Sequence, residues 1–204
     1  MEPGRRERKK LAARAAILDA SSRLFVEQGF EGTRIETIAR DADVGIGTVY
    51  NHFTTKADIL AAILMADIGE VVAGTRALVE RGGPSAAEVL GPAVGVLLGV
   101  MERRSRTLWR DLIGHALLDG GELGAAYRRA ESVLLGVVRE GLDRLRAGGC
   151  IAKTYPAAEG ADIAFALAKA GIYRYVFDDD IEATDVVRDV MRQLAIVAPL
   201  PLRA

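Results

Sequence analysis

Residues 29–60 read GFEGTRIETIARDADVGIGTVYNHFTTKADIL, and this stretch decides how the rest of the chain is interpreted. Apolar periodicity predicts two very short helices in it, over about residues 33–42 and 46–53, joined by the turn Asp43-Val44-Gly45. Isolated helices shorter than about 12 residues are marginal in water. We therefore expect them to pack as a helix-turn-helix against a longer helix that precedes them.

The second of these short helices has one apolar and one polar face. Val49 and Phe53 supply its inward contacts. Small side chains that can form hydrogen bonds remain outward, as a helix that reads base edges in the major groove of DNA requires. They predict a partner of double-stranded DNA. The outward residues are Gly47, Thr48, Tyr50, Asn51 and His52.

The segment before residue 29 predicts an amphipathic helix of about 20 residues that ends at Gly29. The chain as a whole carries a net charge of only −1, but its charges are unevenly spread. Basic residues gather near the N-terminus. Such a cluster is typical of a segment that binds the phosphates of nucleic acid, although a solvated, poorly ordered terminus explains it equally well. Within residues 5–14 the basic residues are Arg5, Arg6, Arg8, Lys9, Lys10 and Arg14, against the single acid Glu7.

The segment after residue 54 predicts six more helices. Thr55-Lys56-Ala57-Asp58 and Ser85-Ala86-Ala87-Glu88 are capping signals for the fourth and fifth helices. Pro92 is expected to kink or restart the fifth helix. Glycines four residues apart lie along one face of that helix and favour close contact with another helix over a wider cavity. They are Gly91, Gly95 and Gly99.

The expected fold is therefore all-α with nine helices and two domains. Residues 1–54 form a three-helix DNA-binding domain, and residues 55–204 form a six-helix domain for ligand binding and dimerisation. The last four helices are expected over about residues 105–118, 122–147, 156–177 and 184–197.

Composition excludes several classes of protein. Cys150 is the only cysteine, so an internal disulfide is impossible, and two histidines 63 positions apart argue against a zinc site. The longest uncharged run, residues 89–101, is shorter than the roughly 20 residues of a membrane span. The acidic residues of the turn at 178–182 could in principle bind the metal of an enzyme, but acids at this position more often stabilise the N-terminus of the helix that follows. We expect a cytoplasmic protein with no enzyme activity and no cofactor.

Residues 29–60 resemble the DNA-binding signature of the TetR family of bacterial transcriptional regulators. The resemblance implies a homodimer that pairs through its last two helices and places each third helix in a major groove. It further implies a repressor released by a small, mostly apolar inducer; an activator and an adaptor without DNA binding are the alternatives. The matching elements are Gly29-Phe30, Gly32-Thr33, Ile38-Ala39, Val44, Gly47-Thr48-Val49-Tyr50, His52-Phe53 and Lys56.

The resemblance also assigns roles along the third helix. Tyr50 is expected to bind a phosphate through its hydroxyl, and His52 to lie near phosphate or bases. Thr48 and Asn51 are the candidates for base edges, because an asparagine amide can pair with adenine. Gly47 lets the backbone approach the duplex.

Three further residues have expected roles outside the third helix. Thr33 should cap the second helix, whose amide end would face phosphate. Arg34 beside it is a phosphate contact or a solvated side chain. Lys56, in the first turn of the fourth helix, should pair with phosphate.

Two departures from the family pattern affect the turn. Asp43 stands where the family usually has glycine, so a left-handed backbone there would carry some cost. Gly45 stands where a serine often caps the third helix, and Thr48 could take part of that work.

The candidates for the ligand site and the dimer interface lie in the second half of the chain. The larger side chains expected to line an inducer pocket, each of which could instead be core, are Met101, Trp109, His115, Tyr127, Phe165 and Tyr173. Small and apolar residues of the eighth and ninth helices suit a two-fold interface, with core inside one protomer as the alternative. On the eighth helix they are Ala161, Ala164, Ala168 and Gly171 beside Phe165, Ile172 and Val176, and on the ninth Val186, Val187, Val190, Leu194 and Val197.

Overall fold

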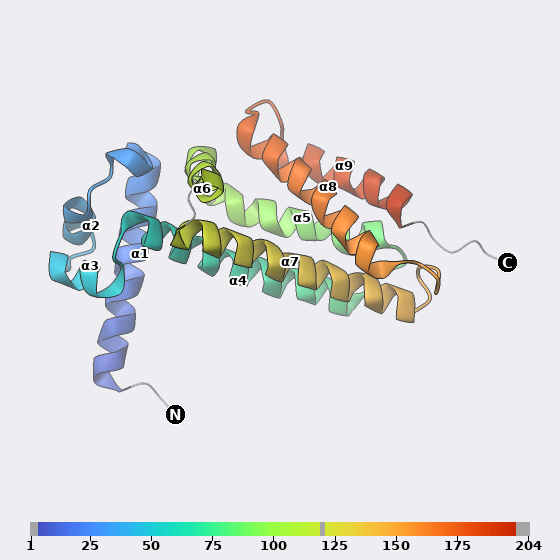
Figure 1. The fold of residues 1–204 in the computed structure, drawn as a ribbon, viewed down its shortest axis with the longest axis horizontal. Helices are drawn as coiled ribbons and strands as arrows, with labels where there is room; N and C mark the ends of the chain where they lie inside the picture. Colours follow the sequence, from blue (N-terminus) through green and yellow to red (C-terminus); the bar gives the residue numbers. More distant parts are fainter. Residues whose placement is uncertain (1–3, 119–120, 199–204) are drawn as a thin grey trace. The chain divides into compact units, whose positions relative to one another are not determined.

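The computed structural model describes residues 4–118 and 121–198, and these residues form nine α-helices and no strand (Figure 1). The all-α fold predicted from the sequence is confirmed. The helices are α1 (Arg5–Gly32), α2 (Ile35–Asp41), α3 (Ile46–His52), α4 (Lys56–Arg81), α5 (Ala86–Glu102), α6 (Arg106–Leu118), α7 (Glu122–Ala147), α8 (Ala157–Phe177) and α9 (Ala183–Val197).

The helices group into two compact units. The first unit comprises the described residues up to Ala66 together with Arg104–Tyr127, and so holds α1, α2, α3, the first part of α4 and all of α6. The second unit comprises Asp67–Arg103 and the described residues from Arg128 onward. A domain boundary at residue 54 stays a prediction. By contacts, α6 groups with α1, α2 and α3, and α4 runs from one unit into the other.

Helix ends follow the capping signals in the sequence. The Asp58 amide donates to Thr55 Oγ1 at 3.1 Å, and the Asp58 carboxylate accepts from the Thr55 amide at 2.9 Å. The Glu88 amide donates to Ser85 Oγ at 3.2 Å in the same way. Each pair satisfies amides that the first turn of a helix leaves without partners, so both capping predictions are confirmed.

The end of α1 is set by a glycine. Gly29 takes the left-handed φ of 74°, so the regular helix breaks there and the chain turns before α2 begins. The sequence predicted this stop, and it is confirmed. The start of α1 differs from the prediction, because helix begins at Arg5 and includes the basic segment that carried no apolar periodicity.

Helix α5 packs closely on α9 through its glycine face. A Cβ added at Gly91 would lie 2.2 Å from Met191 Cγ, and one added at Gly95 would lie 3.7 Å from Val187 Cγ2. The prediction of close helix contact is therefore confirmed at Gly91, and Gly95 is in ordinary van der Waals contact with α9. Gly99 has no such neighbour within 4 Å, and together with Gly95 it lines a hollow between α5 and α9. Pro92 lies inside α5 without restarting it.

Each unit has its own buried apolar side chains. Ile17, Phe25 and Ile38 are fully buried in the first unit, and Leu98 and Leu142 are almost fully buried in the second. Among the described residues, no helix is long and apolar enough to cross a membrane.

Candidate nucleic-acid interface

Helix α3 is held in place by its apolar face. Val49 is fully buried and Phe53 nearly so, and the Arg14 guanidinium of α1 lies 5.4 Å from the centre of the Phe53 ring. The turn before α3 is closed by the Val44 amide, which donates to the Ala39 carbonyl at 3.0 Å. Burying side chains of this size contributes about 1.5–3 kcal/mol each, which is enough to fix a seven-residue helix that would not form alone.

The opposite face of α3 is open to solvent. Tyr50 has 53% of its surface exposed, and Asn51 and Gly47 are also exposed, while Thr48 and His52 are half-buried. A Cβ added at Gly47 would meet no atom within 4 Å, so a second molecule could approach the backbone closely there. The polar face predicted for this helix is thus presented outward; which of its residues contact bases or phosphates stays a prediction.

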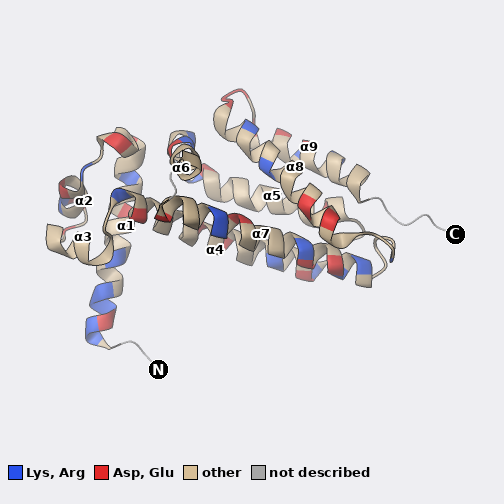
Figure 2. Ribbon diagram, viewed as in Figure 1, with Lys and Arg blue, Asp and Glu red and all other residues tan. Residues whose placement is uncertain are grey.

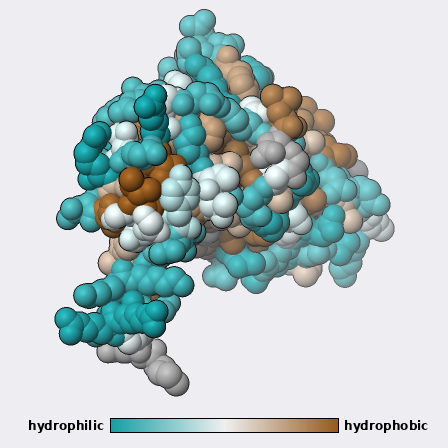
Figure 3. Space-filling view, turned by 60° about the vertical axis from the view of Figure 1, so that its left-hand side comes forward, coloured by the Kyte–Doolittle hydropathy of each residue, from teal (hydrophilic) through white to brown (hydrophobic). Residues whose placement is uncertain are grey.

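The first turns of α1 flank this face. A groove is lined by Arg6 and Lys10 of α1 on one side and by Thr48, Asn51 and His52 of α3 on the other. Figure 2 shows the run of Lys and Arg along these turns of α1, which form the hydrophilic projection at the lower left of Figure 3. The groove therefore combines hydrogen-bonding side chains with the cations of Arg6 and Lys10, the two kinds of group that bases and phosphates require, and Glu7 is the one acid in its lining.

The charges of α1 reach His52 directly. Partial burial, followed by the positive charges of Lys10 and Arg14, lowers the pKa of His52 below its usual 6.5. The imidazole is therefore mainly neutral at pH 7. An anion placed in the groove would offset the repulsion from these two cations and favour the protonated form.

Thr33 does not have the role predicted for it. Its side chain is buried, and its hydroxyl donates backward to the carbonyls of Gly29 at 2.8 Å and Leu24 at 3.2 Å. Arg34, which is exposed, occupies the N-cap position of α2 and makes no side-chain capping bond. The predicted Thr33 cap is wrong, because Arg34 holds the N-cap position of α2 and the Thr33 hydroxyl is hydrogen-bonded to carbonyls of α1 instead.

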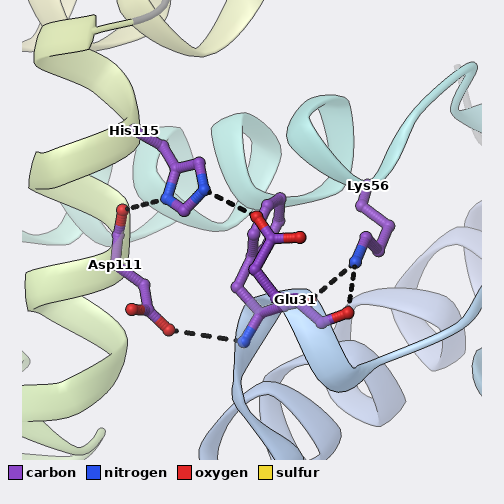
Figure 4. A network of polar contacts seen from close by, with 5 residues as sticks. Glu31, Lys56, Asp111 and His115 are labelled. Atoms are coloured by element: carbon purple, nitrogen blue, oxygen red, sulfur yellow. Dashed lines mark hydrogen bonds and ion pairs between the residues drawn. The ribbon is translucent and has the colours of Figure 1, made fainter.

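Lys56 lies in the first turn of α4, as predicted, with its ammonium directed at the end of α1. Nζ donates to the Phe30 carbonyl at 2.7 Å and to the Glu31 carbonyl at 3.2 Å, and lies 4.7 Å from the centre of the Phe30 ring (Figure 4). These contacts tie α4 to α1 beneath the helix-turn-helix. A contact from Lys56 to phosphate stays a prediction.

The two departures in the turn have different outcomes. Asp43 does adopt a left-handed backbone, with φ of 51°, so the strained position expected there is confirmed. Gly45 is the N-cap residue of α3 and supplies no side-chain hydrogen bond, and Thr48 Oγ1 is 3.8 Å from where a Gly45 Cβ would stand. Helix α3 consequently begins with no side-chain cap.

The six predicted pocket residues are not gathered at one site. Trp109, His115 and Tyr127 belong to the first unit, and Met101 is buried in the second. Phe165 lines an apolar cavity of the second unit, among side chains of α4, α5, α7, α8 and α9, and none of the six lines a second hollow of that unit, between α5 and α9. Met101 and Trp109 are buried as core, and which of the six contact a ligand stays a prediction.

The cavity itself is small and apolar. About 60 Å³ is open inside it, and Thr75 is the one polar residue in its lining. Binding sites for drug-sized ligands occupy about 300–1,000 Å³. Side chains around the cavity must therefore move before it can hold more than a few atoms. Its lining is formed by Val71, Thr75, Leu90, Ala93, Val94, Leu97, Leu134, Val138, Ala164, Phe165, Ala168, Val190 and Leu194.

The small residues of α8 pack inside the protomer. Ala161, Ala164 and Gly171 are buried, and a Cβ at Gly171 would lie 2.7 Å from Val186 Cγ1 of α9. Gly171 is therefore covered by α9 within the protomer, as the alternative of core packing expects, and pairing of two copies through α8 and α9 stays a prediction. The larger apolar side chains that α8 and α9 expose are Ile163, Phe177 and Ile196.

Similarity to known proteins is concentrated on the helix-turn-helix. Residues 17–63 match the family model described as bacterial regulatory proteins, tetR family. Over 131 residues, 63% of this chain, the sequence is 34% identical to the HTH-type transcriptional repressor Rv3405c of Mycobacterium tuberculosis and covers 60% of that protein. The chain spans less than two thirds of the length of the curated relatives that it matches, from 32% in a Staphylococcus aureus regulator to 60% in Rv3405c.

Solved structures share this fold over most of the chain. A protein from Mesorhizobium loti assigned to the TetR family of transcriptional regulators superposes with a TM-score of 0.72 at 20% identity, covering 92% of this chain and 96% of that one. The transcriptional regulator FadR of Bacillus subtilis, solved in complex with stearoyl-CoA, gives 0.71 at 18% identity, covering 88% and 96%. The family match over the helix-turn-helix, the curated relatives and this common fold agree, and the chain belongs to the TetR family of bacterial regulatory proteins.

Proposed function

We propose that this chain is a transcriptional repressor that binds a near-palindromic DNA operator as a homodimer and is released by a small, mostly apolar ligand. The observation that carries the proposal is the exposed polar face of α3 beside the basic turns of α1. One relative is named as a repressor, which favours that sign of regulation.

DNA binding divides into two tasks. Thr48 and Asn51 reach base edges and set the sequence preference, while Tyr50, Arg34 and the cations of α1 bind phosphates and set the register. Lys10 and Arg14 join the phosphate contacts because they lie close enough to α3 to act on His52.

Dimerisation supplies the second reading helix. Ile163, Phe177 and Ile196 leave apolar surface exposed on α8 and α9, and burying it against a second copy would give an isologous interface. Two copies of α3 would then reach successive major grooves, about 34–36 Å apart or somewhat more.

Release requires a ligand that favours one state of the protein over another. FadR of Bacillus subtilis was solved with stearoyl-CoA, which is a precedent in this fold for a ligand that carries a long apolar chain. Here the apolar cavity is the proposed site, and the ligand would enlarge it by displacing side chains such as Phe165. Because α4 contributes Val71 and Thr75 to the cavity and also continues into the first unit, it is the proposed lever.

A direct test combines ligand and DNA. Hydrophobic metabolites and drugs would be screened for those that raise the melting temperature of the protein, and each hit would be added to a protein–DNA complex. A true inducer raises the melting temperature and weakens DNA binding. Ala168→Leu, which fills the cavity, should abolish both effects, whereas Gly99→Ala, outside the cavity lining, should leave them. A ligand that raises the melting temperature of the Ala168→Leu variant as much as that of the unaltered protein would exclude the cavity as its site.

A further inference from the structure

His115 of α6 makes contacts that only its doubly protonated ring can complete. Ring Nδ1 lies 2.8 Å from the Asp111 backbone carbonyl, and ring Nε2 lies 3.0 Å from Glu31 Oε1 (Figure 4). A carbonyl and a carboxylate can only accept hydrogen bonds, and a neutral imidazole carries one N–H. The pair of contacts therefore requires the imidazolium form.

These contacts join helices that are far apart in the sequence. Glu31 belongs to the last turn of α1, while Asp111 and His115 lie on α6. The Asp111 carboxylate accepts from the Phe30 amide at 3.3 Å, and the rings of Phe30 and His115 are 4.7 Å apart between centroids. The last turn of α1, which leads into α2, is thus attached to α6 through two neighbouring residues, Phe30 and Glu31.

The charged groups around the imidazole come from each helix that packs there. Glu31 faces it from α1, and Asp111 and Arg110 lie with it along one hollow of α6. Lys56 of α4 approaches the same turn of α1 but binds the carbonyls of Phe30 and Glu31. The nearest acceptors of the ring are therefore one carboxylate and one carbonyl.

We propose that His115 is a proton-operated latch that ties α6 to the end of α1. The latch is closed when both ring nitrogens carry protons. When the ring is neutral, one nitrogen presents a lone pair to an oxygen, so the contact to either Glu31 or Asp111 is lost. Opening the latch loosens α6 from the element that positions the helix-turn-helix. The latch is a property of the first unit and does not depend on whether the chain binds DNA.

The electrostatics give the direction of the pH dependence. Partial burial is the largest single influence and lowers the pKa of His115, but the hydrogen bond to Asp111, the hydrogen bond to Glu31 and the two carboxylate charges together raise it above 6.5. A raised folded-state pKa means that the contribution to stability is complete below about 6.5 and is lost as pH rises through the folded-state value. Since the Glu31 side chain is 81% exposed, the contribution is modest and sensitive to salt.

The test uses the full chain and its two histidines, whose ring signals can be followed separately by NMR. His115 should titrate above 6.5 with both nitrogens protonated at pH 6, and His52 should titrate below 6.5. Glu31→Gln should lower the His115 pKa without moving that of His52. Glu27→Gln, an exposed change on the same helix, is the matched control and should move neither.

Hydrogen exchange reports the latch itself. The Phe30 amide, which donates to Asp111, should lose protection as pH rises through the His115 pKa, after correction for intrinsic exchange. Glu31→Gln should remove that dependence. A His115 pKa at or below 6.5, an unchanged pKa in Glu31→Gln, or pH-independent protection of Phe30 would each overturn the proposal.

Discussion

Tyr50 and Asn51 are neighbours on α3, yet the account gives them different tasks. Tyr50→Phe removes one hydroxyl from a phosphate contact and should weaken binding to all DNA sequences to a similar extent. Asn51→Ala should cost about 1–3 kcal/mol on the preferred operator and little on others, because it removes a base contact. Fluorescence anisotropy on the operator and on single-base variants measures both effects. Equal losses on every sequence for both variants would contradict this division.

The sequence placed Lys10 in a basic cluster, and the structure adds that it lines the groove with Thr48 and Asn51, where we propose that it binds a phosphate. Lys10→Gln should lower the slope of log affinity against log salt by about 0.9, the value for one phosphate contact. Lys153→Gln, an exposed change far along the chain, is the matched control and should leave the slope unchanged. An identical slope in Lys10→Gln and the unaltered protein would remove α1 from the interface.

At the level of elements, the packing around Gly171 of α8 and Gly99 of α5 predicts opposite effects of alanine at the two positions. Gly171→Ala would place a methyl group 2.7 Å from Val186 Cγ1, and such overpacking should lower the free energy of unfolding by about 1–3 kcal/mol. Gly99→Ala meets no atom within 4 Å in α5 and should raise it by about 0.5–1 kcal/mol through helix propensity. Urea unfolding of both variants checks the pair. A stabilised Gly171→Ala protein would mean that α9 does not pack there as described.

Helix positions were predictable because local features set them. Apolar periodicity located the helices, and Thr55, Asp58, Ser85 and Glu88 marked two of their starts. The first turns of α1 were missed as helix because they contain no apolar residue to give a period. Their charged side chains nevertheless have good intrinsic helix propensity.

The site was predictable only where neighbours in sequence are neighbours in space. The outward face of α3 follows from the order of polar and apolar residues within this one helix. The backward bond of Thr33 depends on how Gly29 breaks α1, and the contacts of Phe30 with Asp111 join residues 81 positions apart. No local pattern reports such pairs. For the same reason the sequence left each pocket candidate with core as an alternative, since large apolar side chains look alike in a core and in a ligand site.

At the scale of the whole molecule, the exposed apolar side chains of α8 and α9 predict a dimer. Ile163→Glu would place a charge in the proposed interface and should weaken association by about 3 kcal/mol, or roughly 100-fold. Leu118→Glu, at an exposed position of α6, is the control and should leave the association unchanged. Sedimentation velocity across a concentration series measures both. Unaltered dimerisation in Ile163→Glu would place the interface elsewhere.

The central claim is that two copies of α3 read DNA. Selection of bound sequences from random duplexes, followed by hydroxyl-radical footprinting of the selected DNA, tests it most directly. The account predicts an enriched near-palindrome with two protected half-sites whose centres are about 34–36 Å apart or somewhat more, bound with strong salt dependence. No enriched sequence, or a single protected site without two-fold symmetry, would contradict it.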